Sequence, residues 1–272
     1  GPESIERNSG IDFRARIGAN ESVFGPSPKA IDAMQRAAGE NWKYSDPENY
    51  NLRNGLADDL GISPENIVIG EGIDGLLGVA ARVFIEPGVE AVMPDGAYPT
   101  FALHITNFGG NLTKVPYVDD KESIDDLLAT AAQKDASVLY FTNTDNPMGT
   151  FWGKDDVGRL IRDLPDNTAL FLDEAYGEFA PEGELPPIDV SNEKVIRFRT
   201  FSKAYGLAGA RIGYVVAHAD VVGAMNKVRN QYGINRVGQI GAYAALQDQE
   251  WLRQVCTWTA EGRERIYEIA GD

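Results

Sequence analysis

The amino-acid sequence predicts an α/β fold, with a mainly parallel sheet and helices on both of its faces. Short apolar runs alternate with stretches of helical periodicity, and these runs are residues 67–69, 91–93, 138–141, 169–172, 195–198 and 212–216. Such alternation is typical of parallel sheets, because successive parallel strands need a crossover connection. The chain has 272 residues, of which 43% are hydrophobic and 24% charged, as in ordinary globular proteins. This length allows one large domain, or a large and a smaller one, with a sizeable core.

Two helices are predicted ahead of the first strand. Ser27-Pro28-Lys29 combines a capping serine with a proline suited to the first helical turn, and the pattern closes at Gly39. Asp46-Pro47-Glu48 repeats this arrangement and predicts a second helix that ends at Gly61.

Helices are also predicted after the last apolar run. We expect one at about residues 220–230, a break at Tyr232-Gly233, and then a long helical stretch from about 239 to 269. No strand pattern follows this stretch, so a second domain would look incomplete. Earlier in the chain, the charged run at residues 119–122 is expected to be a solvated loop and helix start.

Composition excludes several classes of function. The chain has 25 Lys and Arg against 41 Asp and Glu, a formal charge of −16, which opposes binding to nucleic acid or to an anionic membrane. A single cysteine, Cys256, cannot form an intrachain disulfide, and with only His104 and His218 we expect no zinc site. The same scarcity of histidine weighs against a hydrolase of the Ser-His-Asp or Cys-His type.

Targeting features are also not apparent in the sequence. It contains no run of eighteen apolar residues and no leader of basic and then apolar residues. Together with the single cysteine, this leads us to expect a protein of a reducing compartment, the cytoplasm.

The segment Gly70 to Gly75 matches the pattern G-x-G-x-x-G, between an apolar run and a helical pattern. Such a turn exposes backbone N–H groups at a helix N-terminus, which bind phosphate. Asp95 follows the next apolar run at the spacing of a dinucleotide site, so a nicotinamide-dependent dehydrogenase is one interpretation. A tight turn without a ligand is another, since the pattern alone is weakly specific.

A second segment, from Thr200 to Gly213, combines lysine, hydroxyl and arginine side chains. Lys203 follows an apolar run and lies between the hydroxyls of Thr200 and Ser202, and small residues separate it from Arg211. Two hydroxyls and a guanidinium around one phosphate would leave the lysine amine free to form an imine. A surface lysine at the end of a strand is the alternative.

These residues resemble the cofactor-lysine motif of fold-type I pyridoxal-phosphate aminotransferases, and most of all that of the histidinol-phosphate aminotransferases. Further segments resemble motifs of that family in the family's order, and they are Ala19-Asn20-Glu21, Phe24-Gly25-Pro26-Ser27-Pro28, Tyr44-Ser45-Asp46-Pro47, Gly72-Ile73-Asp74, Ala97-Tyr98-Pro99, Asn146-Pro147-Met148-Gly149 and Asp173-Glu174-Ala175-Tyr176. Together they extend over essentially the whole chain. The resemblance implies a large domain with a seven-stranded, mostly parallel sheet, and a small α/β domain that is incomplete here.

The resemblance also implies the cofactor, pyridoxal 5′-phosphate, and a role for each matched residue. Lys203 would form the Schiff base, Asp173 would face the ring nitrogen, and Tyr98 would stack on the ring. Asn146 and Tyr176 would hydrogen-bond the phenolic oxygen of the ring. The phosphate would be held by the residues at the helix start and by the cofactor-lysine segment, namely Gly72, Ile73, Asp74, Thr200, Ser202 and Arg211.

Further implications concern the subunit arrangement and the substrate. Tyr44 resembles a tyrosine that reaches the phosphate in the partner subunit, so the family implies a homodimer with shared sites. Asn20 and Arg236 are the candidates for substrate binding. The large domain is expected at 41–235, with residues 1–40 and 236–272 forming the rest.

We therefore expect a transaminase that moves an amino group between an amino donor, histidinol-phosphate-like or aromatic, and a 2-oxo acid by a ping-pong mechanism. Two alternatives remain beside the dehydrogenase. One is a pyridoxal-phosphate-dependent decarboxylase of an amino-acid phosphate, which differs in the bond that is cleaved at Cα. The other is a catalytically silent cofactor-binding or interaction module.

Overall fold

A seven-stranded sheet forms the centre of the computed structural model, which describes residues 2–15 and 17–271. Its strands are β1 (Ile67–Gly70), β2 (Glu90–Pro94), β3 (Asn111–Val115), β4 (Val138–Thr142), β5 (Ala169–Asp173), β6 (Val195–Thr200) and β7 (Gly213–Val216). Their order across the sheet is β1-β7-β6-β5-β4-β2-β3. β7 runs antiparallel to both of its neighbours and the remaining pairs are parallel. The predicted mainly parallel sheet is thus confirmed.

The strand without an apolar run in the sequence is β3. It lies at the edge of the sheet and pairs only with β2, and its residues are mostly exposed or half-buried. A strand buried on both faces needs a continuous apolar sequence, whereas an edge strand does not. This explains why six apolar runs indicate a sheet of seven strands.

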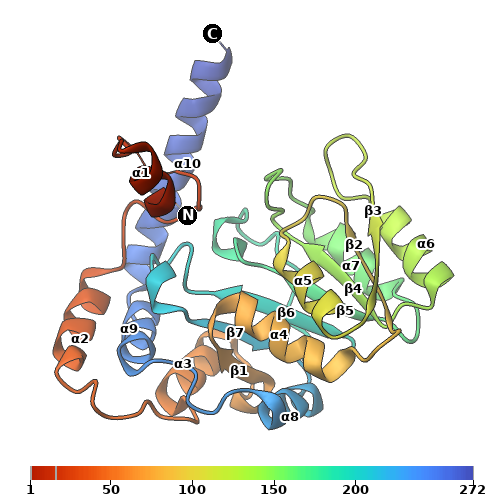
Figure 1. Cartoon of the computed structure of the whole chain (residues 1–272), viewed down its shortest axis with the longest axis horizontal. Helices are drawn as coiled ribbons and strands as arrows, with labels where there is room; N and C mark the ends of the chain where they lie inside the picture. Colours follow the sequence, from red (N-terminus) through yellow and green to blue (C-terminus); the bar gives the residue numbers. More distant parts are fainter. Residues whose placement is uncertain (1, 16, 272) are drawn as a thin grey trace.

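Helices cover both faces of the sheet, as predicted (Figure 1). One face packs against α4 (Gly72–Phe84), α5 (Thr100–Asn107) and α8 (Ala219–Val228). The other packs against α3 (Tyr50–Leu60) and α9 (Arg236–Leu246) at the β1 side, and against α6 (Ile124–Lys134) and α7 (Lys154–Arg162) at the other side. Successive side chains of β1 point to opposite faces of the sheet. Val68 packs in the hydrophobic core with α4, α5 and α8, while Ile67 and Ile69 pack in the core with α3 and α9.

The first of the two early helices begins where the sequence predicts it. α2 (Pro28–Ala38) is capped by Ser27, whose Oγ accepts the backbone N–H of Ala30 at 3.1 Å, and Pro28 occupies the first turn. The predicted start of the second helix is wrong by three residues. Asp46 instead accepts the backbone N–H of Glu48 and Tyr50 in a turn, at 3.0 and 2.7 Å, and α3 begins only at Tyr50.

The long stretch expected near residues 239–269 is two helices. α9 ends at Leu246, and α10 (Gln249–Gly271) starts after a bend at Gln247 and Asp248. α9 packs on α2 and α3, whereas α10 projects from the body of the molecule with α1 (Pro2–Ser9) beside it (Figure 1). No glycine or proline marks the bend, so the apolar periodicity continues across it in the sequence.

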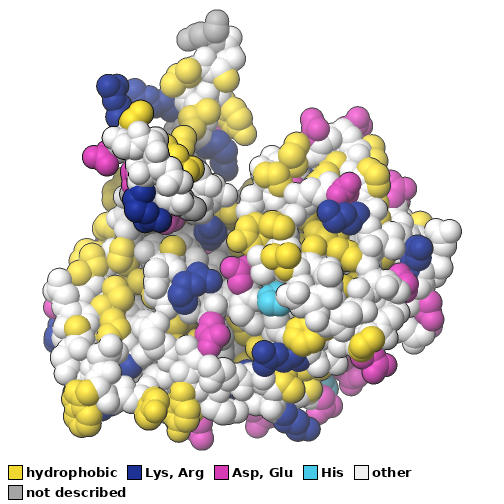
Figure 2. All heavy atoms as spheres, in the orientation of Figure 1, with side chains coloured by type: hydrophobic (Ala, Val, Ile, Leu, Met, Phe, Trp, Pro, Cys, Tyr) yellow, Lys and Arg dark blue, Asp and Glu magenta, His cyan; other side chains and the backbone are white. Residues whose placement is uncertain are grey.

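The projecting part carries exposed apolar side chains, among them Ile5 on α1 and Ile266, Tyr267 and Ile269 on α10. Figure 2 shows the molecule hollowed between this projection and the sheet. Within residues 2–15 and 17–271, the remaining elements are the short 3₁₀ segments η1 (Pro64–Asn66), η2 (Gly177–Phe179) and η3 (Ala208–Ala210). Among the described residues, no helix combines the length and the apolar character needed to cross a bilayer.

Candidate active site

A cavity of about 630 Å³ opens where β4, β5 and β6 end. Thr142, Asp173 and Thr200, the last residues of these strands, line it, together with the start of α4 and the N-terminal segment around Asn20. In open α/β sheets, the carboxyl edge of the strands is the usual place for a ligand, because loops there converge from different elements. The structure therefore places a cavity where the sequence motifs predict a site.

Most of the predicted site residues line this one cavity. They are Asn20, Ile73, Asp74, Tyr98, Asn146, Asp173, Tyr176, Thr200, Ser202, Lys203 and Arg211. Gly72 lies beside them at the start of α4, where a Cβ atom would be 2.6 Å from Nη2 of Arg211. Tyr44 and Arg236 do not line it.

Lys203 points toward the N-terminal segment. Its Nζ donates to the carbonyl oxygens of Ala19 and Asn20, at 3.2 and 3.3 Å, and lies 5.5 Å from the centre of the Tyr176 ring. Burial lowers the pKa of the amine, although the carboxylates of Asp74 and Glu21 oppose this effect. A lysine with a lowered pKa has a larger neutral fraction, which is the nucleophilic form.

Asp173 is buried, with 6% of its surface exposed. Its Oδ2 accepts from the hydroxyl of Tyr140 at 2.7 Å, and its Oδ1 accepts from the backbone N–H of Ala175 at 3.0 Å. Burial raises the pKa of this carboxyl to about 6, against the lowering effect of the two hydrogen bonds. No ion pair with Asp173 is present in the described parts of the chain, so its negative charge is held without a cation.

The residue that sequence reasoning missed here is Tyr140. It lies within the apolar run of β4, is fully buried, and supplies the hydroxyl that orients Asp173. A phenol within an otherwise apolar strand was the only available signal, because a buried tyrosine hydroxyl usually has a hydrogen-bond partner.

Tyr176 lines the cavity three residues after the end of β5, in contact with Asn20. The amide Nδ2 of Asn20 donates to the Tyr176 hydroxyl oxygen at 3.0 Å, so the phenolic O–H remains able to donate elsewhere. Burial raises the pKa of Tyr176, which favours the protonated, donating form. Asn146 and Tyr98 line the same cavity.

Arg211 brings together the segments that the sequence predicts to bind phosphate. It has a left-handed backbone conformation, with φ of 57°, at the end of η3. Its Nη1 lies 3.4 Å from Oγ of Ser202, and its Nη2 lies 3.7 Å from a carboxylate oxygen of Asp74. The hydroxyl oxygen of Thr200 accepts a hydrogen bond from the backbone N–H of Ser202 at 3.0 Å.

The start of α4 lacks a side-chain cap, because Glu71 makes no capping hydrogen bond. The first N–H groups of a helix have no partner within the helix and attract anions. The uncapped turn beside Arg211 and Ser202 is therefore suited to an anionic group.

Tyr44 is 81% exposed, and its ring lies 5.0 Å from that of Tyr232. Arg236 begins α9 and pairs with Glu40 at 2.6 Å, away from the cavity. Their predicted roles in a partner subunit's site and in substrate binding stay predictions.

The dehydrogenase interpretation fails on strand order. In a dinucleotide fold, the first strand lies next to the second strand of its βαβ unit. Here β7, β6, β5 and β4 separate β1 from β2. Asp95, after β2, is exposed and pairs with Lys114 at 3.2 Å. The glycine pattern thus marks the turn into α4, without a dinucleotide fold around it.

The expectation of a solvated charged run at residues 119–122 is wrong for Glu122, which is 1% exposed. Its carboxyl group lies 2.7 Å from the hydroxyl of Thr142, a cavity residue. The three preceding charged residues predict an exposed loop, and no pattern in this run predicts that the fourth side chain turns inward.

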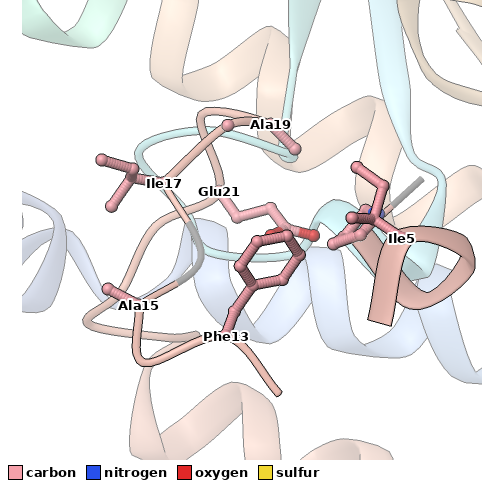
Figure 3. A pocket seen from close by; sticks show the side chains of 8 residues that line it. Ile5, Phe13, Ala15, Ile17, Ala19 and Glu21 are labelled. Carbon is pink, nitrogen blue, oxygen red and sulfur yellow. The ribbon is translucent and has the colours of Figure 1, made fainter. Parts of the chain in front are cut away.

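A second, more apolar cavity of about 460 Å³ lies within the N-terminal segment. Figure 3 shows the side chains of Ile5, Phe13 and Glu21 turned toward it. Ala19 and Glu21 line both cavities, so the two adjoin.

Comparison with known proteins agrees with this geometry. The family model for aminotransferase class I and II matches residues 16–269. Histidinol-phosphate aminotransferase 2 of Carboxydothermus hydrogenoformans is 33% identical over 270 residues, which cover 98% of this chain and 74% of that protein. Histidinol-phosphate aminotransferase of Moorella thermoacetica is 32% identical, over 97% of this chain and 69% of that protein.

A solved structure is more similar still. Histidinol-phosphate aminotransferase from Sinorhizobium meliloti, in complex with pyridoxal-5′-phosphate, has a TM-score of 0.97 and 50% sequence identity. The match covers 100% of this chain and 74% of that one. These relatives give no support to the decarboxylase or to the silent module. We conclude that the chain belongs to the aminotransferase class I and II family of transaminases.

Proposed function

We propose that this transaminase takes its amino group from a donor of the histidinol-phosphate type and passes it to a 2-oxo acid. The observation that carries the proposal is the single cavity in which Lys203, Asp173 and Arg211 meet at the sheet edge. The names of the similar proteins from Carboxydothermus, Moorella and Sinorhizobium support the choice of donor.

The residues of the cavity fit pyridoxal phosphate. Only a glycine leaves room for the guanidinium of Arg211 beside the start of α4, where unpaired N–H groups and Ser202 would hold the phosphate. The buried charge of Asp173, which has no cation beside it, suits a protonated ring nitrogen. When bound, the cofactor supplies a ring that withdraws electrons from the substrate Cα.

We assign the remaining roles to this chain's own groups. The Lys203 amine would bind the cofactor, and after its release by the amino donor would carry the proton from Cα. Its lowered pKa supports both roles. Tyr176 and Asn146 would hydrogen-bond the phenolic oxygen of the ring, Tyr98 would stack on the ring face, and Thr200 would help to position the phosphate. Asn20, which orients the Tyr176 hydroxyl, would lie next to the substrate.

We further propose a cytoplasmic homodimer in which Tyr44 and Arg236 serve the partner subunit's site. The exposure of Tyr44 supports this, since its ring is held by Tyr232 at the surface. We also propose that residues 41–235 form the large domain and that residues 1–40 and 236–272 form a second part. Gly1 and Asp272, at the ends of this second part, lie outside the described residues. The contact between Phe24 and Trp258, with ring centres 5.0 Å apart, joins the two segments of that second part.

Borohydride trapping tests the assignment of Lys203. The protein with pyridoxal phosphate should show a violet absorption band that borohydride removes, and peptide mass analysis should then find the cofactor on Lys203. Lys203→Ala should lack the band, whereas Lys134→Ala, at an exposed position on α6, should retain it. Cofactor on another lysine would contradict the assignment.

The donor is tested by mixing the protein with single amino donors and following the loss of that band. Histidinol phosphate should react faster than histidinol and phenylalanine at equal concentration. A preference for either unphosphorylated compound would refute the proposed donor and leave the reaction class unaffected.

A further inference from the structure

Three buried polar side chains meet behind the cavity, and we name them the Glu122 cluster: Glu122, Thr142 and Asp145. Their exposed fractions are 1%, 4% and 3%. Oγ1 of Thr142 lies 2.7 Å from Oε1 of Glu122 and 2.8 Å from Oδ1 of Asp145. Glu122 precedes α6, Thr142 ends β4, and Asp145 follows in the next loop. The cluster therefore ties three segments together.

The cluster must hold a proton beyond that of the hydroxyl group. A threonine hydroxyl has one proton and can donate to only one of its two carboxyl neighbours. Both carboxyl oxygens nevertheless lie within 2.8 Å of the threonine oxygen. If the second carboxyl group carried no proton, its oxygen and the threonine oxygen would both be acceptors and would repel each other at this distance. One of the two carboxyl groups therefore donates to Thr142.

Their surroundings favour Glu122 as the donor. The second oxygen of Asp145 accepts from the hydroxyl of Tyr117 at 3.1 Å, so Asp145 has two hydroxyl donors. Oε2 of Glu122 is buried and has no hydrogen-bond partner, and the backbone N–H of Thr142 approaches Oε1 only at 3.3 Å. Glu122 forms no ion pair with a lysine or arginine of residues 2–15 and 17–271.

The charged groups that act on the pKa of Glu122 are acidic as well, since the ammonium of the neighbouring Lys121 lies over the ring of Trp152, 3.5 Å from its centre. Asp145 and Asp173 raise its pKa by charge, after the larger effect of burial, and the hydrogen bonds from Thr142 oppose this only in part. Tyr117 and Tyr140, the phenols of the same region, also have raised pKa values and stay neutral. A neutral Glu122 is consistent with every one of these neighbours.

The cluster holds the loop that lines the cavity. Asp145 also anchors the loop through its backbone, since its N–H donates to Thr150 at 3.0 Å and its carbonyl accepts from Gly149 at 3.1 Å. Asn146, the next residue, lines the cavity, as does Thr142 itself. A shift of Asp145 would therefore move the amide of Asn146.

We propose that Glu122 is a positioning residue of the active site: its neutral carboxyl group donates a hydrogen bond to Thr142, so that Thr142 can donate its own hydrogen bond to Asp145 and fix the loop that carries Asn146. The inference rests on the proposed function for the role of Asn146. The protonation of Glu122 itself does not depend on that role.

Infrared spectroscopy of the cofactor-free protein tests the protonation at neutral pH. The wild type should show the C=O stretching band of a buried protonated carboxyl group. The difference between the spectra of the wild type and Glu122→Gln should contain this band, because the buried Glu178, whose pKa burial raises to about 7, contributes equally to both spectra. Asp145→Asn should keep the Glu122 band. A wild type without the band, or a band lost in Asp145→Asn but kept in Glu122→Gln, would overturn the assignment to Glu122.

Titration with pyridoxal phosphate tests the positioning. Glu122→Gln keeps a neutral donor, so its dissociation constant should stay within about threefold of the wild type, whereas Glu122→Leu should raise it by about tenfold. In an Asn146→Ala background, the same leucine substitution should change the constant by less than about threefold, because its effect passes through Asn146. The positioning role would be refuted if Glu122→Leu raised the dissociation constant equally in the wild-type and Asn146→Ala backgrounds. It would also be refuted if Glu122→Gln bound pyridoxal phosphate as weakly as Glu122→Leu.

Two further points keep the outcomes distinct. If Glu122→Leu does not fold, Thr142→Val replaces it in the same comparison, because valine has a similar shape and lacks the hydroxyl. If the wild type does not bind pyridoxal phosphate at all, the proposed function fails, and the infrared bands still decide whether Glu122 holds the proton.

Discussion

Replacing Asp173 by asparagine should stabilise the cofactor-free protein at neutral pH while it weakens cofactor binding. Asparagine has nearly the same shape and can keep both contacts of the carboxylate. Its oxygen can accept from the backbone N–H of Ala175. Its amide can donate to the oxygen of Tyr140, whose hydroxyl in the wild type donates to the carboxylate at 2.7 Å. The main change is the loss of a buried negative charge.

The magnitude follows from the pKa of this carboxyl, which burial raises from 3.8 to about 6. Above the higher value, both the folded and the unfolded chain carry the charge, and ionisation then opposes folding by about 1.36 kcal/mol for each unit of the shift. The shift corresponds to about 3 kcal/mol. Below the unfolded value of 3.8, both states are protonated and this cost vanishes. The cost therefore grows as pH rises between these two values.

The assay is urea unfolding of the cofactor-free wild type and Asp173→Asn at about pH 4, 5, 6 and 7. The free energies of unfolding should be nearly equal at the lowest pH, and the variant should gain up to about 3 kcal/mol by pH 7. Asp119→Asn serves as the matched control, because Asp119 lies in an exposed loop with a left-handed backbone that suits asparagine.

Added pyridoxal phosphate should reverse the order, since binding stabilises the wild type more. A difference that does not change with pH, or a variant that is less stable at pH 7, would refute the argument from burial. Equal stabilisation of both proteins by the cofactor would refute the pairing of Asp173 with the ring nitrogen.

Two further substitutions test separate parts of the site. Arg211→Met should raise the dissociation constant for pyridoxal phosphate by about 10- to 100-fold, the worth of a charged hydrogen bond, whereas Arg162→Met, on the exposed end of α7, should leave it unchanged in the same titration. Glu174→Gln should lower the free energy of unfolding by about 3–5 kcal/mol in urea, because the buried Glu174 pairs with Arg197 at 2.6 Å and the arginine would keep its charge. The control is Asp125→Asn, which breaks the exposed pair of Asp125 with Arg159 and should leave the urea midpoint of unfolding unchanged. An unchanged midpoint in Glu174→Gln as well would contradict the importance of the buried pair.

Local chemistry made part of the fold predictable from the sequence. The start of α2 depends on Ser27 and Pro28, which act on the adjacent backbone. The central strands are buried on both faces, and this requires the apolar runs that the sequence shows. The edge strand β3 and the bend at Asp248 left no such pattern, because half-exposed strands and bends between packed helices tolerate ordinary sequences.

The candidate site divides in the same way. The residue types around Lys203, Asp173 and Arg211 predict the chemistry, and their order along the chain was sufficient to predict one site, where the structure shows one cavity. Contacts between distant segments required the tertiary structure. Tyr140 reaches Asp173 from a neighbouring strand, and Asn20 reaches Tyr176 across 156 positions of the chain.

The sequence by itself determined the fold class, and it predicted the turn proposed to bind phosphate and the set of reactive side chains, because each prediction depends on the chemistry of neighbouring residues. Only the tertiary structure decided that β1 and β2 lie apart, which removes the dinucleotide interpretation, and that Glu122 turns inward against Thr142. Strand order and burial arise from packing between segments far apart in the chain, and local sequence does not encode them.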